Sequence, residues 1–254
     1  MILAICFVAV VHAGQINQAN EITYERLLQS DEEIGDASYV PCFNEIFKVL
    51  KVKTLLEFGL GYSTKYFLDS CKKVISIEVI THGYGPDFMK KFIQLYRDYS
   101  NWIPIAYFSG YQGDVNWAPY KYLASDNVYK ACSHQCSVGV PHYSTIDNFY
   151  KKELNEFISN LTRYNKVDVV FINPALFLRG DLVEILFDKV PVIVAHATNS
   201  RKFGQTGKAD TWGYSRLVAR DEYEEIYIPT KSGTTVWISK TPEYQPLIQA
   251  LKQL

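Results

Sequence analysis

The sequence has no excess of charge of either sign. It contains 26 Lys and Arg residues against 27 Asp and Glu residues, and its formal net charge is −1 at pH 7. Tight binding to the phosphate backbone of a nucleic acid needs a basic surface, so this balance argues against a nucleic-acid-binding protein. Internal repeats and low-complexity tracts are also missing. The 254 residues, 48% of them hydrophobic, are typical of one globular domain with a single core.

Long hydrophobic runs are scarce as well. The N-terminus carries ten consecutive apolar residues, 2–11, and the small residues Val11 and Ala13 flank His12 at the end of this run. Ten residues are too few to cross a bilayer as a helix, which needs about 20. The pattern is typical of a secretory signal peptide, although no Lys or Arg precedes it. We therefore predict a signal peptide over residues 1–14, a domain over 15–254, and no stable membrane span in the mature chain.

This leader predicts a secreted protein. The alternative interpretation is a first strand or helix packed on the core of a cytoplasmic protein. Cysteine bears on the same question, because four cysteines remain after removal of the leader: Cys42, Cys71, Cys132 and Cys136. An oxidising compartment would permit disulfides with three possible pairings, most simply Cys132 to Cys136. A metal site around Cys132, His134 and Cys136 is a further alternative, but no second cysteine pair completes a zinc site. In the cytoplasm we expect free thiols.

Apolar runs of strand length alternate with helical segments through the middle of the chain. The predicted strands are 54–58, 74–80, 102–108, 167–173 and 191–196. The predicted helices are 44–50 before the first strand, and then 64–72, 86–99, 148–164 and 180–189. Such alternation, with nearly continuous apolar strands, is typical of a parallel sheet with helices on both faces.

The two ends of this alternating region have another character. Residues 15–40 are polar and acidic, and they are predicted to pack over the edge of the domain. Runs 224–229 and 234–239 flank a turn with Gly233, which predicts an antiparallel hairpin followed by a last helix from Pro242. Segment 109–147 shows no periodicity and is predicted to be an irregular insertion with a functional or lid role.

Together these patterns predict an α/β fold. We expect a Rossmann-like, mostly parallel seven-stranded sheet with helices on both faces and a C-terminal antiparallel hairpin.

Two glycines stand between the first predicted strand and its helix. Gly59 and Gly61 allow a tight turn, and the helix that follows presents unpaired N–H groups to a polar ligand. Glu78 ends the next strand, where an acid can accept both hydroxyls of a ribose, at close to the roughly 20-residue spacing of nucleotide-binding units. Thr64 stands where the dinucleotide motif has its third glycine. The turn therefore favours a cofactor that has a ribose but no phosphates.

These residues resemble the class I S-adenosylmethionine-dependent methyltransferases over about residues 40–240. Residues 57–61 (EFGLG) are similar to the first motif of that family, and 74–78 (VISIE) to its second strand with the ribose-binding acid. Runs 167–173 and 191–196 are similar to its fourth and fifth strands, and the hairpin to its reversed sixth and seventh strands. Segments 179–181 (RGD) and 212–214 (WGY) resemble a little-studied branch of the family.

The resemblance implies S-adenosyl-L-methionine as the cofactor. Gly59 and Gly61 would approach its methionine part, Glu78 would hold the ribose, and Ser63 or Thr64 would cap the helix and contact it. Asp114 is a further candidate on the adenine side. The implied cofactor-binding residues are Glu57, Gly59, Gly61, Ser63, Thr64, Glu78 and Asp114.

The sequence departs from the family at the fourth and fifth strands. Many members have Asp at the end of the fourth strand and His-Asp at the end of the fifth, and in the metal-dependent members these acids hold a divalent ion. Here Asn173 stands in the first place, and Ala197 follows His196 in the second. Neutral Asn and Ala cannot form the anionic oxygen site that magnesium prefers, so we predict a metal-independent enzyme.

His196 and Asn173 are the candidate catalytic residues. His196 could act as a general base, or it could be a buried structural histidine. Asn173-Pro174 is similar to the start of the Asn-Pro-Pro-aromatic motif of amino-methylating enzymes, but Ala175 and Leu176 replace the rest of that motif.

Two functions remain open. One is a methyltransferase of unknown acceptor, favoured by Glu57, the two glycines and Glu78. The other is a catalytically inactive, secreted domain that binds a small ligand or a protein partner. Asn173, Ala197 and the predicted signal peptide favour this second interpretation.

Overall fold

The computed structural model describes residues 26–27, 36–81, 85–124, 148–174, 179–199, 212–214 and 217–254. The strands in this part of the chain are β1 (Thr54–Phe58), β2 (Lys73–Ile80), β3 (Trp102–Phe108), β4 (Tyr120–Leu123), β5 (Val169–Ile172), β6 (Val192–His196), β7 (Tyr223–Ile228) and β8 (Thr234–Ser239). The helices are α3 (Val40–Val49), α4 (Thr64–Ser70), α5 (Pro86–Leu95), α7 (Asn148–Asn165), α8 (Arg179–Leu186), the 3₁₀ helix η3 (Pro242–Tyr244) and α10 (Gln245–Leu251).

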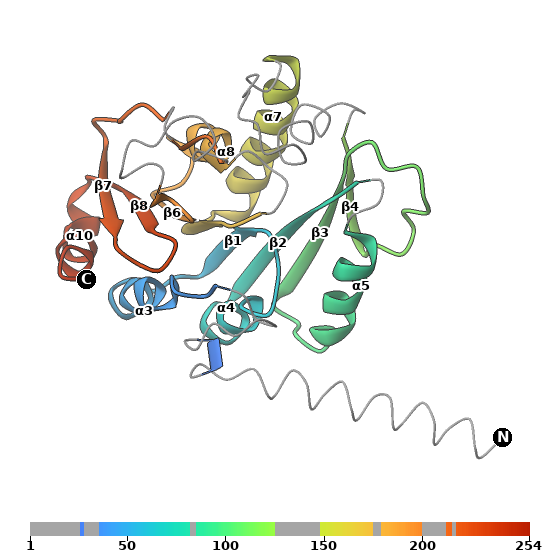
Figure 1. The fold of residues 1–254 in the computed structure, drawn as a ribbon, viewed down its shortest axis with the longest axis horizontal. Helices are drawn as coiled ribbons and strands as arrows, with labels where there is room; N and C mark the ends of the chain where they lie inside the picture. Colours follow the sequence, from blue (N-terminus) through green and yellow to red (C-terminus); the bar gives the residue numbers. More distant parts are fainter. Residues whose placement is uncertain are drawn as a thin grey trace.

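All eight strands belong to one sheet in the order β4-β3-β2-β1-β5-β6-β8-β7 (Figure 1). Strands β1 to β6 are parallel, and β8 is antiparallel to both of its neighbours. From β1 the chain builds β2, β3 and β4 on one side and then returns to add β5 and β6 on the other. This reversal makes the carboxyl ends of β1 and β5 the place where open α/β sheets bind ligands. The predicted Rossmann-like class and its C-terminal hairpin are confirmed.

Helices cover both faces of the sheet (Figure 1). Side chains of α3, α4, α5 and α10 form one hydrophobic cluster with the sheet, and side chains of α7 and α8 form a second cluster on its other face. Every residue of β1, β5 and β6 is buried. Burial on both faces explains why these strands appear in the sequence as continuous apolar runs rather than as alternating patterns.

Among the described residues the sheet has eight strands, one more than the seven predicted. Strand β4 lies within the segment 109–147 that was predicted to be irregular, and it extends the sheet by parallel pairing with β3. Its side chains are mostly exposed, with Tyr120 at 50% and Leu123 at 61%. An edge strand with exposed side chains leaves no apolar run in the sequence. Residues 125–147, which include Cys132 and Cys136, lie outside the described residues.

The described part of the chain also bears on the predictions about the cysteines and about membrane-spanning segments. Cys42 and Cys71 are buried, free thiols. Burial raises the pKa of the Cys71 thiol to about 12, and nearby acidic charges add to this effect. None of the described helices combines the length and apolar character needed to span a membrane. The predicted signal peptide, residues 1–14, lies outside the described residues.

Candidate cofactor and catalytic site

The turn between β1 and α4 is fixed by the backbone of Gly59. Gly59 has a φ of +87°, a conformation that L-residues with side chains rarely adopt. Its amide donates a hydrogen bond to the carbonyl of Ile77 in β2 at 2.9 Å. On the other side, a Cβ atom at Gly59 would lie 2.5 Å from the carbonyl oxygen of Asn173. The turn therefore runs so close to the end of β5 that no side chain fits between them.

Gly61 has the opposite surroundings. No described heavy atom lies within 4 Å of the place that its Cβ would take. Its amide donates to the Thr64 hydroxyl at 2.9 Å, and the Tyr96 hydroxyl donates to its carbonyl at 3.1 Å. The backbone of the turn is thus held by the protein while the Cα of Gly61 faces open space that a ligand could approach.

Glu78, near the end of β2, turns its carboxylate toward this turn. The side chain is buried, and its Oε2 accepts a hydrogen bond from the amide of Leu60 at 3.1 Å. Burial raises the pKa of Glu78 to about 8; the Leu60 hydrogen bond lowers it, and the charge of Glu57 raises it further. The spacing prediction for Glu78 and the glycine turn therefore corresponds to a direct contact.

Glu57, in β1, is a second acid beneath the turn, and it is completely buried. Its Oε1 accepts a hydrogen bond from the Ser76 hydroxyl at 2.5 Å, and Trp102 Nε1 donates to the same hydroxyl oxygen at 2.8 Å. Its Oε2 is buried without a hydrogen-bond partner in the described part of the chain. Burial raises the pKa of Glu57 to about 7, and the hydroxyls of Ser76 and Thr64 act in the opposite direction.

Ser63 and Thr64 do not cap α4 as predicted. Ser63 stands at the N-cap position without a side-chain capping bond, because its own backbone is already helical (φ −67°, ψ −16°). Its Oγ instead accepts a hydrogen bond from the Tyr39 hydroxyl at 2.6 Å. Thr64 is buried, and its hydroxyl oxygen accepts a hydrogen bond from the Gly61 amide. Both hydroxyls therefore stabilise the turn from within the protein.

The carboxyl ends of β5 and β6 carry no acid in the places where the resembled family has them. Asn173 is half-buried. Its backbone N–H continues the pairing with β1 by donating a hydrogen bond to the backbone carbonyl of Phe58 at 2.9 Å. Ala197 has a φ of +58°, which is rare for a residue with a side chain. Strained backbone of this kind occurs preferentially at functional sites. Within the described ranges, no cluster of three or more His, Cys, Asp or Glu residues could hold a metal.

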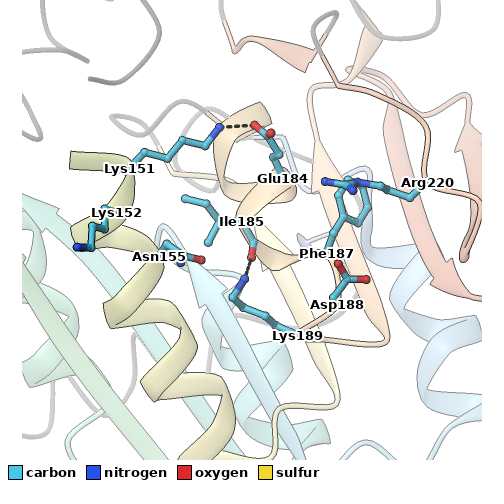
Figure 2. Close-up of a pocket in the computed structure, with 9 residues that line it drawn as sticks. All are labelled: Lys151, Lys152, Asn155, Glu184, Ile185, Phe187, Asp188, Lys189 and Arg220. Atoms are coloured by element: carbon cyan, nitrogen blue, oxygen red, sulfur yellow. Dashed lines mark hydrogen bonds and ion pairs between the residues drawn. The ribbon is translucent and has the colours of Figure 1, made fainter. Parts of the chain in front are cut away.

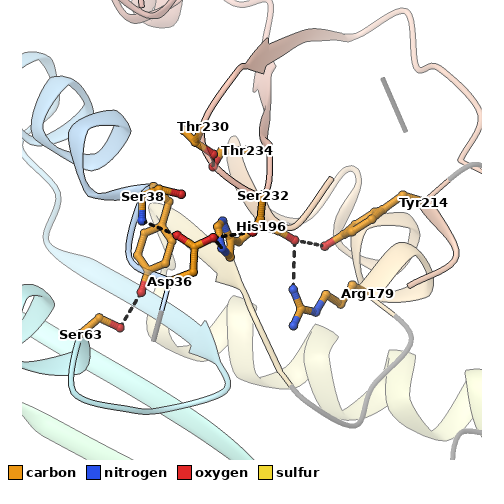
Figure 3. A network of polar contacts seen from close by, with 10 residues as sticks. Asp36, Ser38, Ser63, Arg179, His196, Tyr214, Thr230, Ser232 and Thr234 are labelled. Carbon is orange, nitrogen blue, oxygen red and sulfur yellow. Dashed lines mark hydrogen bonds and ion pairs between the residues drawn. The ribbon is translucent and has the colours of Figure 1, made fainter. Parts of the chain in front are cut away.

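His196 lies at the end of β6 in a buried polar cluster (Figure 3). Its Nε2 is 3.3 Å from Oδ2 of Asp36, while its Nδ1 is buried without a hydrogen-bond partner among the described residues. Its backbone carbonyl accepts hydrogen bonds from Arg179 at 3.0 Å and from the Tyr214 hydroxyl at 2.9 Å. The ring of Tyr39 packs edge-on against the imidazole, with 4.9 Å between the centroids.

Sequence reasoning missed two residues of this cluster. Asp36 comes from the polar segment before α3, where nothing local distinguishes it from other acids. Arg179 was noted only within a resembling segment, but it is buried and links the ends of two strands. Its Nε donates to the carbonyl of Pro174 at 3.0 Å, and its guanidinium stacks on Trp212 at 3.9 Å from the ring centroid. Segments 179–181 and 212–214 therefore pack against each other.

Asp114 is the predicted site residue that stays apart. Its carboxylate is exposed and accepts a hydrogen bond from the amide of Asn116 at 2.9 Å, within its own loop. The structure brings the other predicted residues together at the carboxyl edge of the sheet. Glu57, Gly59, Gly61, Thr64 and Glu78 form the turn and its support, and Asn173 lies against Gly59.

A separate hollow of about 430 Å³ lies between α7 and α8 (Figure 2). No residue of the glycine turn, and none from the carboxyl ends of the parallel strands, contributes to it, so it is not part of the candidate site. Its lining residues are Lys151, Lys152, Asn155, Glu184, Ile185, Phe187, Asp188, Lys189 and Arg220.

Comparison with known proteins gives likeness in structure alone. Neither a family model nor a curated protein matches the sequence. Among solved structures, the chain is similar to a Staphylococcus aureus protein assigned as a caffeoyl-CoA O-methyltransferase (14% identity, TM-score 0.48, covering 93% of this chain and 99% of that one). It is also similar to the SAH-bound Podospora anserina methyltransferase PaMTH1 (10% identity, TM-score 0.46, covering 91% of this chain and 88% of that one). A third similar structure is the N-methyltransferase NodS from Bradyrhizobium japonicum in complex with S-adenosyl-L-homocysteine (9% identity, TM-score 0.41, covering 90% of this chain and 98% of that one). At these identities and TM-scores, none of the likenesses carries an argument about activity.

Proposed function

We propose that this protein is an S-adenosyl-L-methionine-dependent methyltransferase that works without a metal ion. The observation that carries the proposal is the contact between Glu78 and the glycine turn. The buried carboxylate accepts the Leu60 amide at 3.1 Å, beside a glycine whose Cα faces open space. A carboxylate at the tip of one strand and a bare backbone turn on its neighbour, at the switch point of an α/β sheet, suit an adenosyl group.

The residues present fit this group in three ways. Gly61 leaves room where a side chain would stand, so the backbone can be approached closely. Glu78 can accept hydrogen bonds from ribose hydroxyls, which are strong when the acceptor is ionised. Glu57 adds a second acidic group below the turn, and its Oε2 lacks a partner in the described residues.

The cofactor, when bound, supplies a methyl group attached to a positively charged sulfur. The work left to the protein is to align the acceptor and to take up its proton. His196 is the candidate for the second task, because its Nδ1 is a nitrogen without a partner among the described residues. Asn173, at the end of the neighbouring strand, is the candidate for orienting the acceptor.

Metal independence follows from the chemistry of the available donors. Asn173 and Ala197 stand where an anionic oxygen site would need carboxylates. The acid that does lie beside His196 is Asp36, and its oxygens are occupied by hydrogen bonds from Ser38 and Ser232 as well as by His196. A pair of one histidine and one carboxylate offers too few hard ligands for magnesium.

Calorimetric titration of the purified chain with S-adenosylhomocysteine tests the proposal. We expect saturable binding in the wild type and a loss of affinity of about a hundredfold in Glu78→Ala, since two hydrogen bonds to a charged acceptor are removed. Glu243→Ala, an exposed acid on η3, is the matched control and should bind as the wild type does. Absence of heat in the wild type at high ligand concentration would exclude the proposal and leave the inactive binding domain as the interpretation.

We also propose that the protein enters the secretory pathway and loses residues 1–14. Mass spectrometry of the protein secreted by a eukaryotic expression host would give the mature N-terminus. A mature chain that retains Met1 or begins at Ile2 would exclude this proposal.

A further inference from the structure

Three segments that are distant in the sequence meet at His196 (Figure 3). His196 ends β6, Asp36 lies in the segment before α3, and Ser232 lies in the turn between β7 and β8. The Asp36 carboxylate contacts both the imidazole and the Ser232 hydroxyl (Figure 3). The acid that accompanies this histidine is therefore supplied by the N-terminal segment, and not by the next residue, Ala197.

Asp36 is held in a single orientation. Its Oδ1 accepts the Ser38 amide at 3.0 Å, and its Oδ2 accepts the Ser232 hydroxyl and lies 3.3 Å from His196 Nε2. Burial alone would raise the pKa of Asp36, but the hydrogen bonds from His196, Ser232 and Ser38 outweigh it and hold the pKa well below its usual range. An ionised carboxylate can only accept hydrogen bonds, so the proton between the two side chains belongs to Nε2.

The second nitrogen of the ring is in a different environment. Nδ1 of His196 is buried, and no described residue accepts or donates a hydrogen bond there. A proton on Nδ1 would leave a buried donor unpaired, which is unfavourable. Of the two neutral tautomers, the one with its proton on Nε2 and a lone pair on Nδ1 is therefore favoured.

The same N-terminal segment also touches the glycine turn. Tyr39 lies edge-on against the His196 ring, and its hydroxyl donates to Ser63 at the start of α4. Residues 36–39 thus contact both parts of the candidate site. The orientation of the base and the position of the turn depend on one short stretch of chain.

We infer that Asp36 is a positioning residue: it fixes His196 in the Nε2–H tautomer and makes Nδ1 the proton acceptor of the site. The catalytic consequence rests on the proposed function, and it requires that the acceptor reach Nδ1, which is buried in this structure. In the transfer step, the O–H or N–H bond of the acceptor breaks, its proton forms a bond to Nδ1, and the electron pair stays on the acceptor as the nucleophile. The positive charge that then appears on the ring is offset by the carboxylate of Asp36, as in other carboxylate–histidine pairs.

Nuclear magnetic resonance of the full chain, labelled with ¹⁵N at histidine, tests the tautomer directly. Long-range ¹H–¹⁵N correlations distinguish a protonated from an unprotonated ring nitrogen, and His196→Gln identifies the signals among five histidines. At neutral pH we expect Nε2 protonated and Nδ1 unprotonated in the wild type. In Asp36→Ala we expect a mixture of both tautomers. Asp98→Asn, the same loss of charge at an exposed turn, is the control and should leave the signals unchanged.

Two results would overturn the inference: a wild-type ring that is protonated at Nδ1, or a tautomer preference that persists in Asp36→Ala. Should Asp36→Ala fail to fold, Asp36→Asn keeps the shape and an acceptor oxygen, and Ser232→Ala removes only one of the bonds that orient Asp36. Both variants should weaken the tautomer preference.

Titration of the same samples with S-adenosylhomocysteine separates this inference from the proposed function. Wild-type protein that binds the ligand but has the wrong tautomer refutes the role of Asp36 alone, whereas the expected tautomer without ligand binding refutes the methyltransferase proposal alone.

Discussion

The carbonyl oxygen of Asn173 lies 2.5 Å from the place that a Cβ atom would take on Gly59. This contact joins the end of β5 to the turn after β1, the two strands between which the chain reverses its direction of growth. In the proposed function, an adenosyl group would bind beside these two residues. The contact therefore makes the shape of the site depend on the absence of a single methyl group.

Gly59→Ala should disrupt the turn. The new methyl group would collide with backbone atoms of Asn173 and Pro174, and the φ of +87° would add strain, so we expect a loss of at least about 2 kcal/mol in the free energy of unfolding. Urea denaturation measures this loss, and calorimetry should show that binding of S-adenosylhomocysteine is abolished.

Gly61→Ala is the matched comparison, because its methyl group would meet no described atom within 4 Å. Its stability should stay within about 1 kcal/mol of the wild type. Its affinity for S-adenosylhomocysteine should nevertheless fall, since the methyl group occupies the open side of the turn. Equal binding by Gly61→Ala and the wild type would show that the ligand does not approach this side.

The sequence predicted the sheet well where strands are buried on both faces. Strands β1 and β3 begin and end at the predicted residues, because every residue of β1 is buried and its apolar run has sharp limits. Strand β4 could not be predicted in this way, since solvent permits polar and apolar side chains equally along an exposed edge.

The candidate site was predictable in its local part only. Gly59, Gly61 and Glu78 follow a spacing rule within one strand-helix-strand unit, and in the structure Glu78 contacts the turn through the amide of Leu60. The pairing of Asp36 with His196 joins positions 160 residues apart, and no local pattern marks either partner. Similarly, the Ser63 hydroxyl is engaged by Tyr39 because α3 packs over the turn, a tertiary effect that overrides the capping preference of serine.

The stability of the ligand-free protein should fall between about pH 4.5 and pH 8. The pKa of Glu57 is raised to about 7 and that of Glu78 to about 8, mainly by burial, from an ordinary value of 4.5. A raised folded-state pKa means that the folded protein holds these protons more tightly than the unfolded chain. The stabilisation is complete below pH 4.5 and is lost as the pH rises through the folded-state values, by several kcal/mol for the two groups together.

Urea denaturation across this pH range measures the effect. Glu78→Gln stays neutral at every pH and should remove much of the slope, whereas Glu243→Gln, an exposed control, should retain it. A slope that is identical in the wild type and in Glu78→Gln would contradict the assignment of the effect to Glu78.

Binding of S-adenosylhomocysteine near neutral pH should release protons. Ribose hydroxyls donate to Glu78 more strongly when it is ionised, and the ammonium group of the ligand favours negative charge nearby, so binding lowers the pKa values that burial has raised. Calorimetry in two buffers with different heats of ionisation gives the number of protons released. The affinity should rise with pH up to about 8, and a release of zero protons at neutral pH would contradict the role of Glu78 in holding the ribose.

Magnesium should not stabilise the protein. Asn173 and Ala197 provide no carboxylate at the ends of β5 and β6, and the described residues contain no cluster of three or more His, Cys, Asp or Glu at which magnesium binding could raise the stability. Thermal melting of EDTA-treated protein, with and without millimolar magnesium, should give the same midpoint. Asn173→Asp combined with Ala197→Asp introduces two carboxylates at the ends of β5 and β6 and serves as the positive comparison, in which magnesium should raise the midpoint. A midpoint that rises with magnesium in the wild type would refute metal independence.

Tyr39→Phe should loosen the glycine turn without disturbing the core. The ring of Tyr39 is buried against Phe171 and His196 and is kept by this exchange, while the hydroxyl bond to Ser63 at 2.6 Å is lost. We expect a stability loss of about 1 kcal/mol, as for one buried hydrogen bond, and a several-fold weaker affinity for S-adenosylhomocysteine. Tyr99→Phe removes a comparable hydroxyl bond, to Asp69 at 3.0 Å on the surface, and should leave the affinity unchanged. If Tyr39→Phe bound the ligand as tightly as Tyr99→Phe does, the N-terminal segment would support the fold but not the cofactor turn.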